Sequence, residues 1–147
     1  MRQILFLFLC TYTVACTPTA VLQNEQDAVR AVWDASVAAA LAGDYDAWAT
    51  DFSDDIEIVN PDVSMRLQGR RDVEKVYRRA FENTILFTDI DTKRFDVKVS
   101  PRGDFAWGTA VAEVTAGGEK TVSWYALVFE KVDGSWKMVL GYNAAAK

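Results

Sequence analysis

The sequence predicts one small α+β domain, in which three N-terminal helices pack on a strongly bent, mostly antiparallel sheet. The chain has 147 residues, half of them hydrophobic, which is enough for one core. Apolar residues recur at three- and four-residue steps in its first half, whereas they alternate with polar residues in its second half. Helices followed by a run of strands is the order typical of the α+β class.

A long amphipathic helix is predicted over residues 24–42. Asn24 can cap its beginning and Gly43 can end it. Its apolar stripe consists of Val29, Val32, Trp33, Val37, Ala40 and Leu41.

Two shorter helices are predicted after it. Asp44 can cap the first, over residues 44–52, and a strand over 56–60 follows the acidic turn Asp54-Asp55. After a turn at Pro61 and a short strand near residues 65–67, Gly69 precedes the other helix. The apolar face of that helix consists of Val73, Val76, Tyr77, Ala80 and Phe81.

The rest of the chain predicts antiparallel strands that alternate at period two. We expect one face of the last strand to carry Trp136, Met138, Leu140 and Tyr142, and one face of an earlier strand to carry Phe105, Trp107, Thr109 and Val111. The pair Asp133-Gly134 indicates a tight hairpin. Helices on one face of such a sheet form a cone, and its open end is a natural place for a pocket.

The first residues have the pattern of an export signal. Arg2 precedes an apolar stretch too short to span a bilayer, followed by small residues. Residues 13–16, Thr-Val-Ala-Cys, resemble the lipobox of bacterial lipoproteins. We therefore expect a signal peptide over 1–15, Cys16 as the lipid-carrying N-terminus, a tether over 16–23 and the domain over 24–147, held at the cell envelope. The alternative is plain signal cleavage nearby, without a lipid.

Composition narrows the chemistry available to the domain. With 16 basic and 21 acidic residues the net charge is −5, which gives no electrostatic basis for binding nucleic acid. There is no histidine, and both cysteines, Cys10 and Cys16, lie in the N-terminal segment. The domain therefore lacks the usual general base, a thiolate nucleophile and the commonest metal ligands. The acidic residues of 51–57 lack the spacing of a calcium loop, so we expect no metal and no cofactor.

Five short motifs follow one another along the chain, at residues 42–46, 52–55, 69–71, 103–107 and 133–137. In this order and spacing they resemble the SnoaL-like and DUF4440 branches of the nuclear transport factor 2 (NTF2-like) superfamily, which includes ketosteroid isomerase. The resemblance implies a cone-shaped domain that forms a homodimer through its sheet.

The parts of the isomerase mechanism do not carry over to this chain. The resemblance places Asn60 where the isomerase has its general-base aspartate, and an amide has no usable basicity near neutral pH. It places Ser36 where the isomerase has a pocket tyrosine, and a serine stabilises an enolate poorly. Residues 122–129, where the protonated aspartate belongs, contain no acid.

We therefore expect a module that binds a small apolar or aromatic ligand in its cone. The candidate ligand contacts are Trp33, Ser36, Asn60, Trp107 and Tyr125. For the polar pair there are structural alternatives: Asn before Pro starts a turn, and a helical serine bonds the carbonyl four residues back. The aromatic residues can equally serve core and dimer packing. Because Trp124 and Tyr125 are adjacent in a strand, only one of them can face the helices.

Two other functions stay open. One is a cyclase- or isomerase-like enzyme with a different carboxylate base, for which Asp62, Asp91 and Glu113 are the candidates. The other is an interaction module whose cavity is filled by its own side chains. The contents and size of the cavity distinguish the three.

Overall fold

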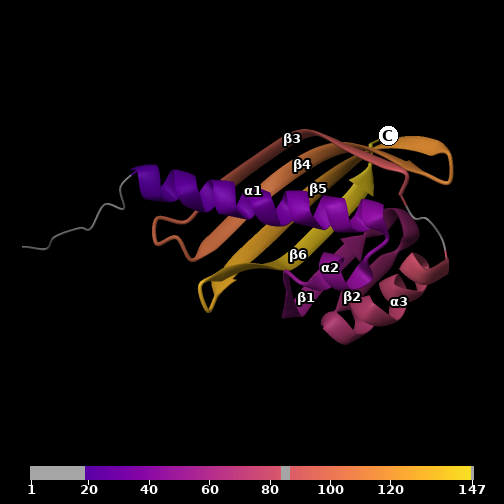
Figure 1. The fold of residues 1–147 in the computed structure, drawn as a ribbon, viewed down its shortest axis with the longest axis horizontal. Helices are drawn as coiled ribbons and strands as arrows, with labels where there is room; N and C mark the ends of the chain where they lie inside the picture. Colours follow the sequence, from indigo (N-terminus) through magenta and orange to yellow (C-terminus); the bar gives the residue numbers. More distant parts are fainter. Residues whose placement is uncertain (1–18, 84–86, 147) are drawn as a thin grey trace, which may run out of the picture.

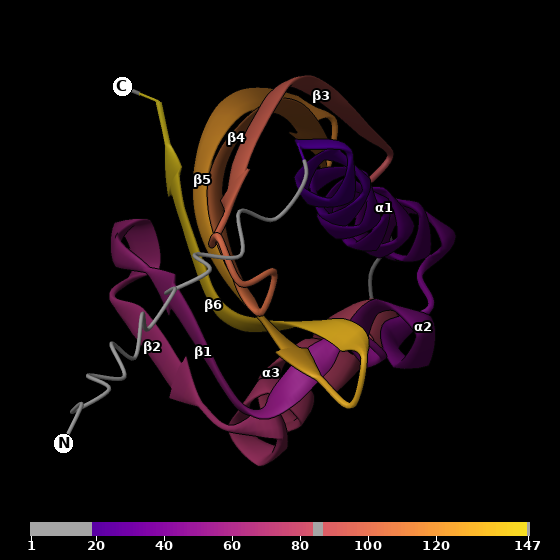
Figure 2. The same ribbon diagram turned by 90° about the vertical axis from the view of Figure 1, so that its left-hand side faces the viewer.

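A curled sheet forms the body of the molecule, and the helices cover its concave side (Figures 1 and 2). The computed structural model describes residues 19–83 and 87–146. Within them the sheet has six strands in the order β2-β1-β6-β5-β4-β3, and neighbours run antiparallel except β1 and β6, which are parallel. The predicted α+β class and the bent, mostly antiparallel sheet are confirmed. The strands are β1 (Phe52–Asn60), β2 (Met65–Gln68), β3 (Asp89–Val99), β4 (Phe105–Ala116), β5 (Glu119–Val132) and β6 (Ser135–Ala145).

Helix α1 (Thr19–Ala42) lies along the concave side of the sheet and begins earlier than the sequence pattern indicated (Figure 1). Asn24 lies inside the helix and does not cap it, and residues 19–23 of the expected tether are helical. Ala, Leu and Gln in this stretch are good helix formers, so nothing local stops the helix at Asn24. Gly43 ends the helix as predicted, with a φ of +69° that a residue without Cβ adopts easily.

Helix α2 (Tyr45–Ala49) has the predicted cap, because the Asp44 carboxylate accepts a hydrogen bond from the Ala47 amide at 2.9 Å. It ends sooner than predicted. Residues 54–55 belong to β1 and are not a turn. The reason is a distant residue: the Arg70 guanidinium donates to the Ala49 and Phe52 carbonyls at 2.8 and 2.6 Å, at the junction of α2 and β1.

The 3-10 helix η1 (Pro61–Val63) and helix α3 (Arg70–Asn83) complete the described helical elements. Gly69 precedes α3 with a φ of +79°, as its position suggested. Val73 and Phe81 are buried, but Val76 is 41% exposed and is not part of the buried face. The helix packs against β1, β2 and α2, and Val76 lies outside the face that makes these contacts.

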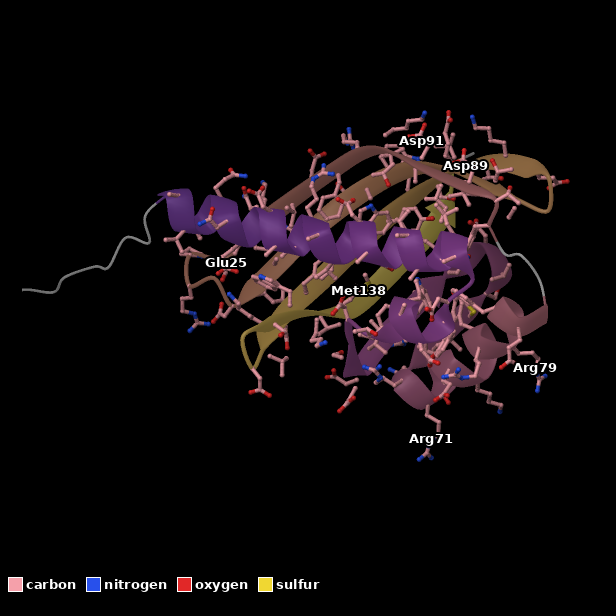
Figure 3. The ribbon with its side chains drawn as sticks, in the orientation of Figure 1. Glu25, Arg71, Arg79, Asp89, Asp91 and Met138 are labelled. Atoms are coloured by element: carbon pink, nitrogen blue, oxygen red, sulfur yellow. The ribbon has the colours of Figure 1, made fainter. Side chains whose placement is uncertain are left out.

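The core lies between α1 and the sheet, where Val29 and Phe129 are completely buried and Met138, labelled in Figure 3, is 5% exposed. Strand β4 alternates as predicted, but the face that meets the core carries the even-numbered residues and is not the face with Trp107. Ala106, Ala110 and Ala112 are fully buried, whereas Trp107 is 46% exposed. The small side chains of this strand therefore face inward, and a large one, Trp107, lies on the outer face.

Strand β6 changes its facing half way along. Val128 pairs with Leu140 and Phe129 with Met138, so Val139 is an extra residue on β6, which is a β-bulge. Trp136 and Met138 face the core before the bulge, but Gly141 and Asn143 face inward after it. The expectation that Leu140 continues the inner face is therefore wrong, because one inserted residue reverses the alternation. Tyr142 is 38% exposed but still borders the cavity.

Candidate functional site

A cavity of about 130 Å³ lies inside the cone, beside the C-terminal half of α1. Helices α1, α2 and α3 and strands β1, β3, β5 and β6 all contribute to its wall. The wall is mostly apolar, and no Asp, Glu, Lys or Arg among the described residues lines it. Its apolar and aromatic members are Trp33, Val37, Ala40, Trp48, Phe52, Ile58, Phe81, Phe87, Ile90, Leu127 and Met138.

Two pairs of aromatic rings hold the wall in shape. The rings of Trp33 and Tyr125 meet edge to face, with centroids 5.1 Å apart, and those of Trp48 and Tyr77 lie 4.9 Å apart. The Trp33 indole N–H donates to the Thr92 hydroxyl at 3.1 Å. Because its polar atom has a protein partner, Trp33 offers the cavity an apolar ring.

Five polar side chains also line the cavity: Ser36, Tyr77, Tyr125, Tyr142 and Asn143. Ser36 lies one turn after Trp33 on α1. Asn143 lies directly opposite Tyr125 in the β5–β6 pairing, on the inner face that follows the bulge. Amide and hydroxyl groups in an apolar wall can orient a ligand by hydrogen bonds.

The hydroxyls of Tyr77 and Tyr125 in the wall stay protonated near neutral pH. Burial raises the pKa of Tyr77 to about 12, and the nearby Tyr125 adds to that shift. Burial raises the pKa of Tyr125 as well, although a hydrogen bond with Ser123 opposes the change. The cavity therefore presents neutral hydrogen-bond donors and acceptors to a ligand.

Of the five ligand contacts predicted from the sequence, the structure brings three together in this wall: Trp33, Ser36 and Tyr125. Asn60 is not in the cavity wall. Its side chain accepts a hydrogen bond from the Asp62 amide at 3.0 Å and caps η1, which is the turn alternative. Trp107 is also outside, because the alternation of β4 directs it to the outer face.

The three carboxylates considered as alternative bases lie elsewhere. Asp62 accepts a hydrogen bond from the Ala145 amide at 2.6 Å. Glu113 forms an ion pair with Lys120 at 2.6 Å, and Asp91 pairs with Lys93. Figure 3 shows Asp91 at the outer edge of the sheet, away from the layer that contains Met138. A reaction that uses one of these bases in the cavity is therefore unsupported.

Tyr77 and Asn143 are site residues that the sequence did not indicate. Tyr77 was assigned to the apolar face of its helix, where the pattern gives no sign of its hydroxyl. Strict alternation from Trp136 would put Asn143 on the outer face, and the bulge at Val139 turns it inward. No local sequence signal marks that bulge.

The predicted signal peptide and Cys16 lie outside the described residues. Among residues 19–83 and 87–146, no helix is long and apolar enough to cross a membrane. The same residues contain no group of three or more His, Cys, Asp or Glu side chains placed to hold a metal ion.

Comparisons with solved structures identify the fold. A proposed dehydratase of the NTF2-like family from Streptomyces avermitilis superimposes with a TM-score of 0.74 at 18% identity, over 85% of this chain and 98% of that one. A proposed ketosteroid isomerase from Shewanella frigidimarina gives 0.70 at 16% identity, over 81% and 96%. An NTF2-like protein with a cystatin-like fold from Novosphingobium aromaticivorans gives 0.71 at 18%, over 87% and 86%. Identities this low establish the fold and carry no activity across.

The family follows from the sequence itself. No curated protein matches the chain, but residues 29–141 match the family model described as a SnoaL-like domain. The match covers most of the chain, including all the strands up to the bulge in β6. The DUF4440 branch of the expectation stays a prediction. The chain belongs to the SnoaL-like family, and its fold is that of the NTF2-like superfamily.

Proposed function

We propose that this protein is a binding module that takes up a small apolar molecule in its cone. The observation that carries the proposal is the cavity itself, which has a largely aromatic wall with a few neutral polar groups. Small-molecule sites commonly have this composition. An interaction module with a filled interior is less consistent with a cavity of about 130 Å³.

Binding accounts for the wall better than a reaction does. The described wall contains no carboxylate, and Tyr77 and Tyr125 are poor bases because they stay protonated. General-base catalysis needs a group with a pKa near the working pH, within hydrogen-bond reach of the proton that it removes.

A cavity-filling variant tests the proposal. Ser36→Phe places a ring in the cavity, whereas Ala35→Phe, its neighbour on α1, places the same ring on the exposed side of the helix. In a thermal-shift screen of neutral apolar fragments, we expect several to raise the melting temperature of the wild type and of Ala35→Phe, but not of Ser36→Phe. A wild type that responds to no fragment, or a Ser36→Phe variant that responds like the wild type, would overturn the proposal.

We further propose that the domain is anchored at the cell envelope by a lipid on Cys16. The support is the sequence pattern of residues 1–16. In a bacterial host given labelled palmitate, the wild type should incorporate the label and sediment with membranes, and Cys16→Ser should do neither. The matched control is Cys10→Ser, because Cys10 lies within the expected signal peptide, and this variant should behave like the wild type. Equal labelling of both variants would contradict the anchor.

We also propose that two copies pair through the outer face of the sheet. The outer sides of β4 and β5 expose Trp107, Val122 and Trp124, at 46, 39 and 47%. Exposed apolar clusters of this kind often mark a protein interface. By analytical ultracentrifugation we expect a wild-type dimer and a folded Trp124→Glu monomer; a wild-type monomer at every concentration would refute the pairing.

A further inference from the structure

A groove lies outside the cone, where the first half of α1 runs beside β3 (Figures 1 and 2). Its volume is about 600 Å³, within the range of about 300–1,000 Å³ that small-molecule sites usually have. No described residue lines both this groove and the cavity of the cone. In contrast to the cavity, its wall contains charged side chains of both signs. The groove is therefore a separate site with a different chemistry.

Contacts across the groove hold Arg30 in place. Strand β3 is at the end of the sheet, so one row of its backbone groups has no strand partner. Arg30 Nη2 donates to the Phe95 carbonyl, and Gln26 Nε2 donates to the Val97 carbonyl, both at 3.4 Å. The Arg30 guanidinium also lies 5.2 Å from the centre of the Phe95 ring. Its position is thus fixed, while most of its N–H groups have no partner among the described residues.

The charges of the groove are unevenly satisfied. The acids have donors, because Asp96 pairs with Arg94 at 2.9 Å and Asp27 accepts a hydrogen bond from a glutamine amide at 3.0 Å. The two cations in the wall, Arg30 and Lys98, form no ion pair within the part of the chain that the structure describes. An anion would therefore find two positive charges that the protein itself does not use.

An exposed ring lies beside one of these cations. Trp107 lines the groove and is 46% exposed. The β3–β4 register places it directly opposite Lys98, so the two side chains are neighbours on one face of the sheet. An open indole ring is a flat apolar surface on which another ring can stack.

We infer that this groove binds a carboxylate that carries an aromatic ring. Arg30 and Lys98 hold the carboxylate, and Trp107 holds the ring. A guanidinium matches the two oxygens of a carboxylate with two parallel hydrogen bonds, and the ammonium adds a second positive charge. Asp27 and Asp96 in the same wall oppose a second negative charge on the ligand, which favours a carboxylate over a phosphate dianion.

Three probes test the inference. 4-Phenylbutanoate has the ring and the carboxylate, 4-phenylbutanamide has the same shape without the charge, and butanoate has the charge without the ring. Binding is measured by microscale thermophoresis in dilute protein, because Trp107 also belongs to the face proposed to pair two copies. We expect 4-phenylbutanoate to bind about 3- to 10-fold more tightly than either control, and more weakly as the salt is raised to about 0.5 M. Equal binding of the acid and the amide would overturn the role of the cations.

Variants at exposed positions assign the contacts. We expect Arg30→Gln, Lys98→Gln and Trp107→Ala each to weaken 4-phenylbutanoate binding about 3- to 10-fold with little change in melting temperature. The control is Arg71→Gln, because Figure 3 shows Arg71 on α3, pointing away from the body of the molecule and remote from the first half of α1. It should bind like the wild type. If Arg71→Gln weakened binding as much as Arg30→Gln, the effect would be general electrostatics and the site would be wrong.

Ser36→Phe separates the groove from the cone. It fills the cavity and leaves the groove untouched, so it should bind 4-phenylbutanoate like the wild type. If Ser36→Phe abolished binding and Arg30→Gln did not, the probe would occupy the cone and the inference would fail. A wild type that does not bind 4-phenylbutanoate would also refute it. The inference is independent of the proposed function, because an empty screen of neutral fragments leaves it standing.

Discussion

The two ends of α1 contact the sheet in opposite ways. Near its beginning, the Glu25 carboxylate accepts hydrogen bonds from Lys131 at 2.6 and 2.7 Å and from the Trp136 indole at 2.8 Å. Near its end, Ser36 lines the cavity, where the Tyr77 hydroxyl has no partner among the described residues. Figure 3 shows Glu25 at the end of the molecule remote from α2 and α3.

The difference shows where polar groups serve stability and where they are available for binding. At the beginning of α1, the polar side-chain atoms of Glu25, Lys131 and Trp136 are paired with one another. The Lys131 ammonium also lies 5.6 Å from the centre of the Trp136 ring. At the cavity end, hydroxyl and amide groups remain available, and this costs stability that a packed core would keep. Mutations at the two ends should therefore separate stability from ligand response.

We expect the largest loss of stability near the beginning of α1, where Trp136 packs beside Glu25. Trp136→Ala removes a ring that is 5% exposed and leaves Glu25 without one of its donors. We expect the free energy of unfolding to fall by about 3–5 kcal/mol, measured by urea denaturation. A loss below about 1 kcal/mol would show that this end is not a packing centre.

Replacing the Glu25 carboxylate should lower the free energy of unfolding by a smaller amount, and this loss should depend on pH. Hydrogen bonding to Lys131 holds the pKa of Glu25 below its usual value of 4.5. A carboxyl with a lower pKa in the folded state stabilises the fold above its unfolded pKa, and that contribution is lost as the pH falls through the folded value. At pH 7 we expect Glu25→Gln to cost about 1–2 kcal/mol, a difference that shrinks below pH 4.5.

Lys131→Met provides the control for that measurement. In its background the same Glu25→Gln change should show little pH dependence, because the cation that lowers the pKa of Glu25 is gone. A pH dependence that persists without Lys131 would assign the effect to a different partner.

Asn60 distinguishes a cap from a cavity contact. Asn60→Ala removes the acceptor for the Asp62 amide, and we expect it to lower the free energy of unfolding by about 0.5–1 kcal/mol. Its response to the neutral apolar fragments of the thermal-shift screen should match that of the wild type. If the variant had the stability of the wild type but responded less to the ligand, Asn60 would be a binding residue and not a cap.

The smallest effect is expected at the cavity end. Ser36→Ala removes a hydroxyl that faces the cavity and introduces the best helix former. We expect the free energy of unfolding to rise or to stay within about 0.5 kcal/mol, in contrast to Glu25→Gln on the same helix. A loss of more than about 1 kcal/mol would mean that Ser36 has a structural partner.

Much of the fold could be predicted because it depends on neighbouring residues. The cap at Asp44, the helix end at Gly43 and the hairpin at Asp133-Gly134 are local interactions, and the structure contains all three. Boundaries set by distant groups could not be predicted in the same way. The short α2 ends where Arg70 reaches its last carbonyl, from a helix that begins well after it in the chain.

The candidate site was predicted in part for the same reason. Trp33 and Ser36 could be assigned because their helix has one stripe toward the core. Trp107 was assigned wrongly because alternation gives two faces of a strand without saying which one meets the helices.

The sequence by itself determined the α+β class, the family and the apolar character of the interior, because these follow from composition, periodicity and short motifs. The tertiary structure alone decided which polar groups reach the cavity. Tyr77 arrives on α3 and Asn143 through the bulge at Val139, and both positions depend on how separate elements meet in space. A residue that changes the register of a sheet acts on side chains beyond it, so its effect is visible only in the assembled fold.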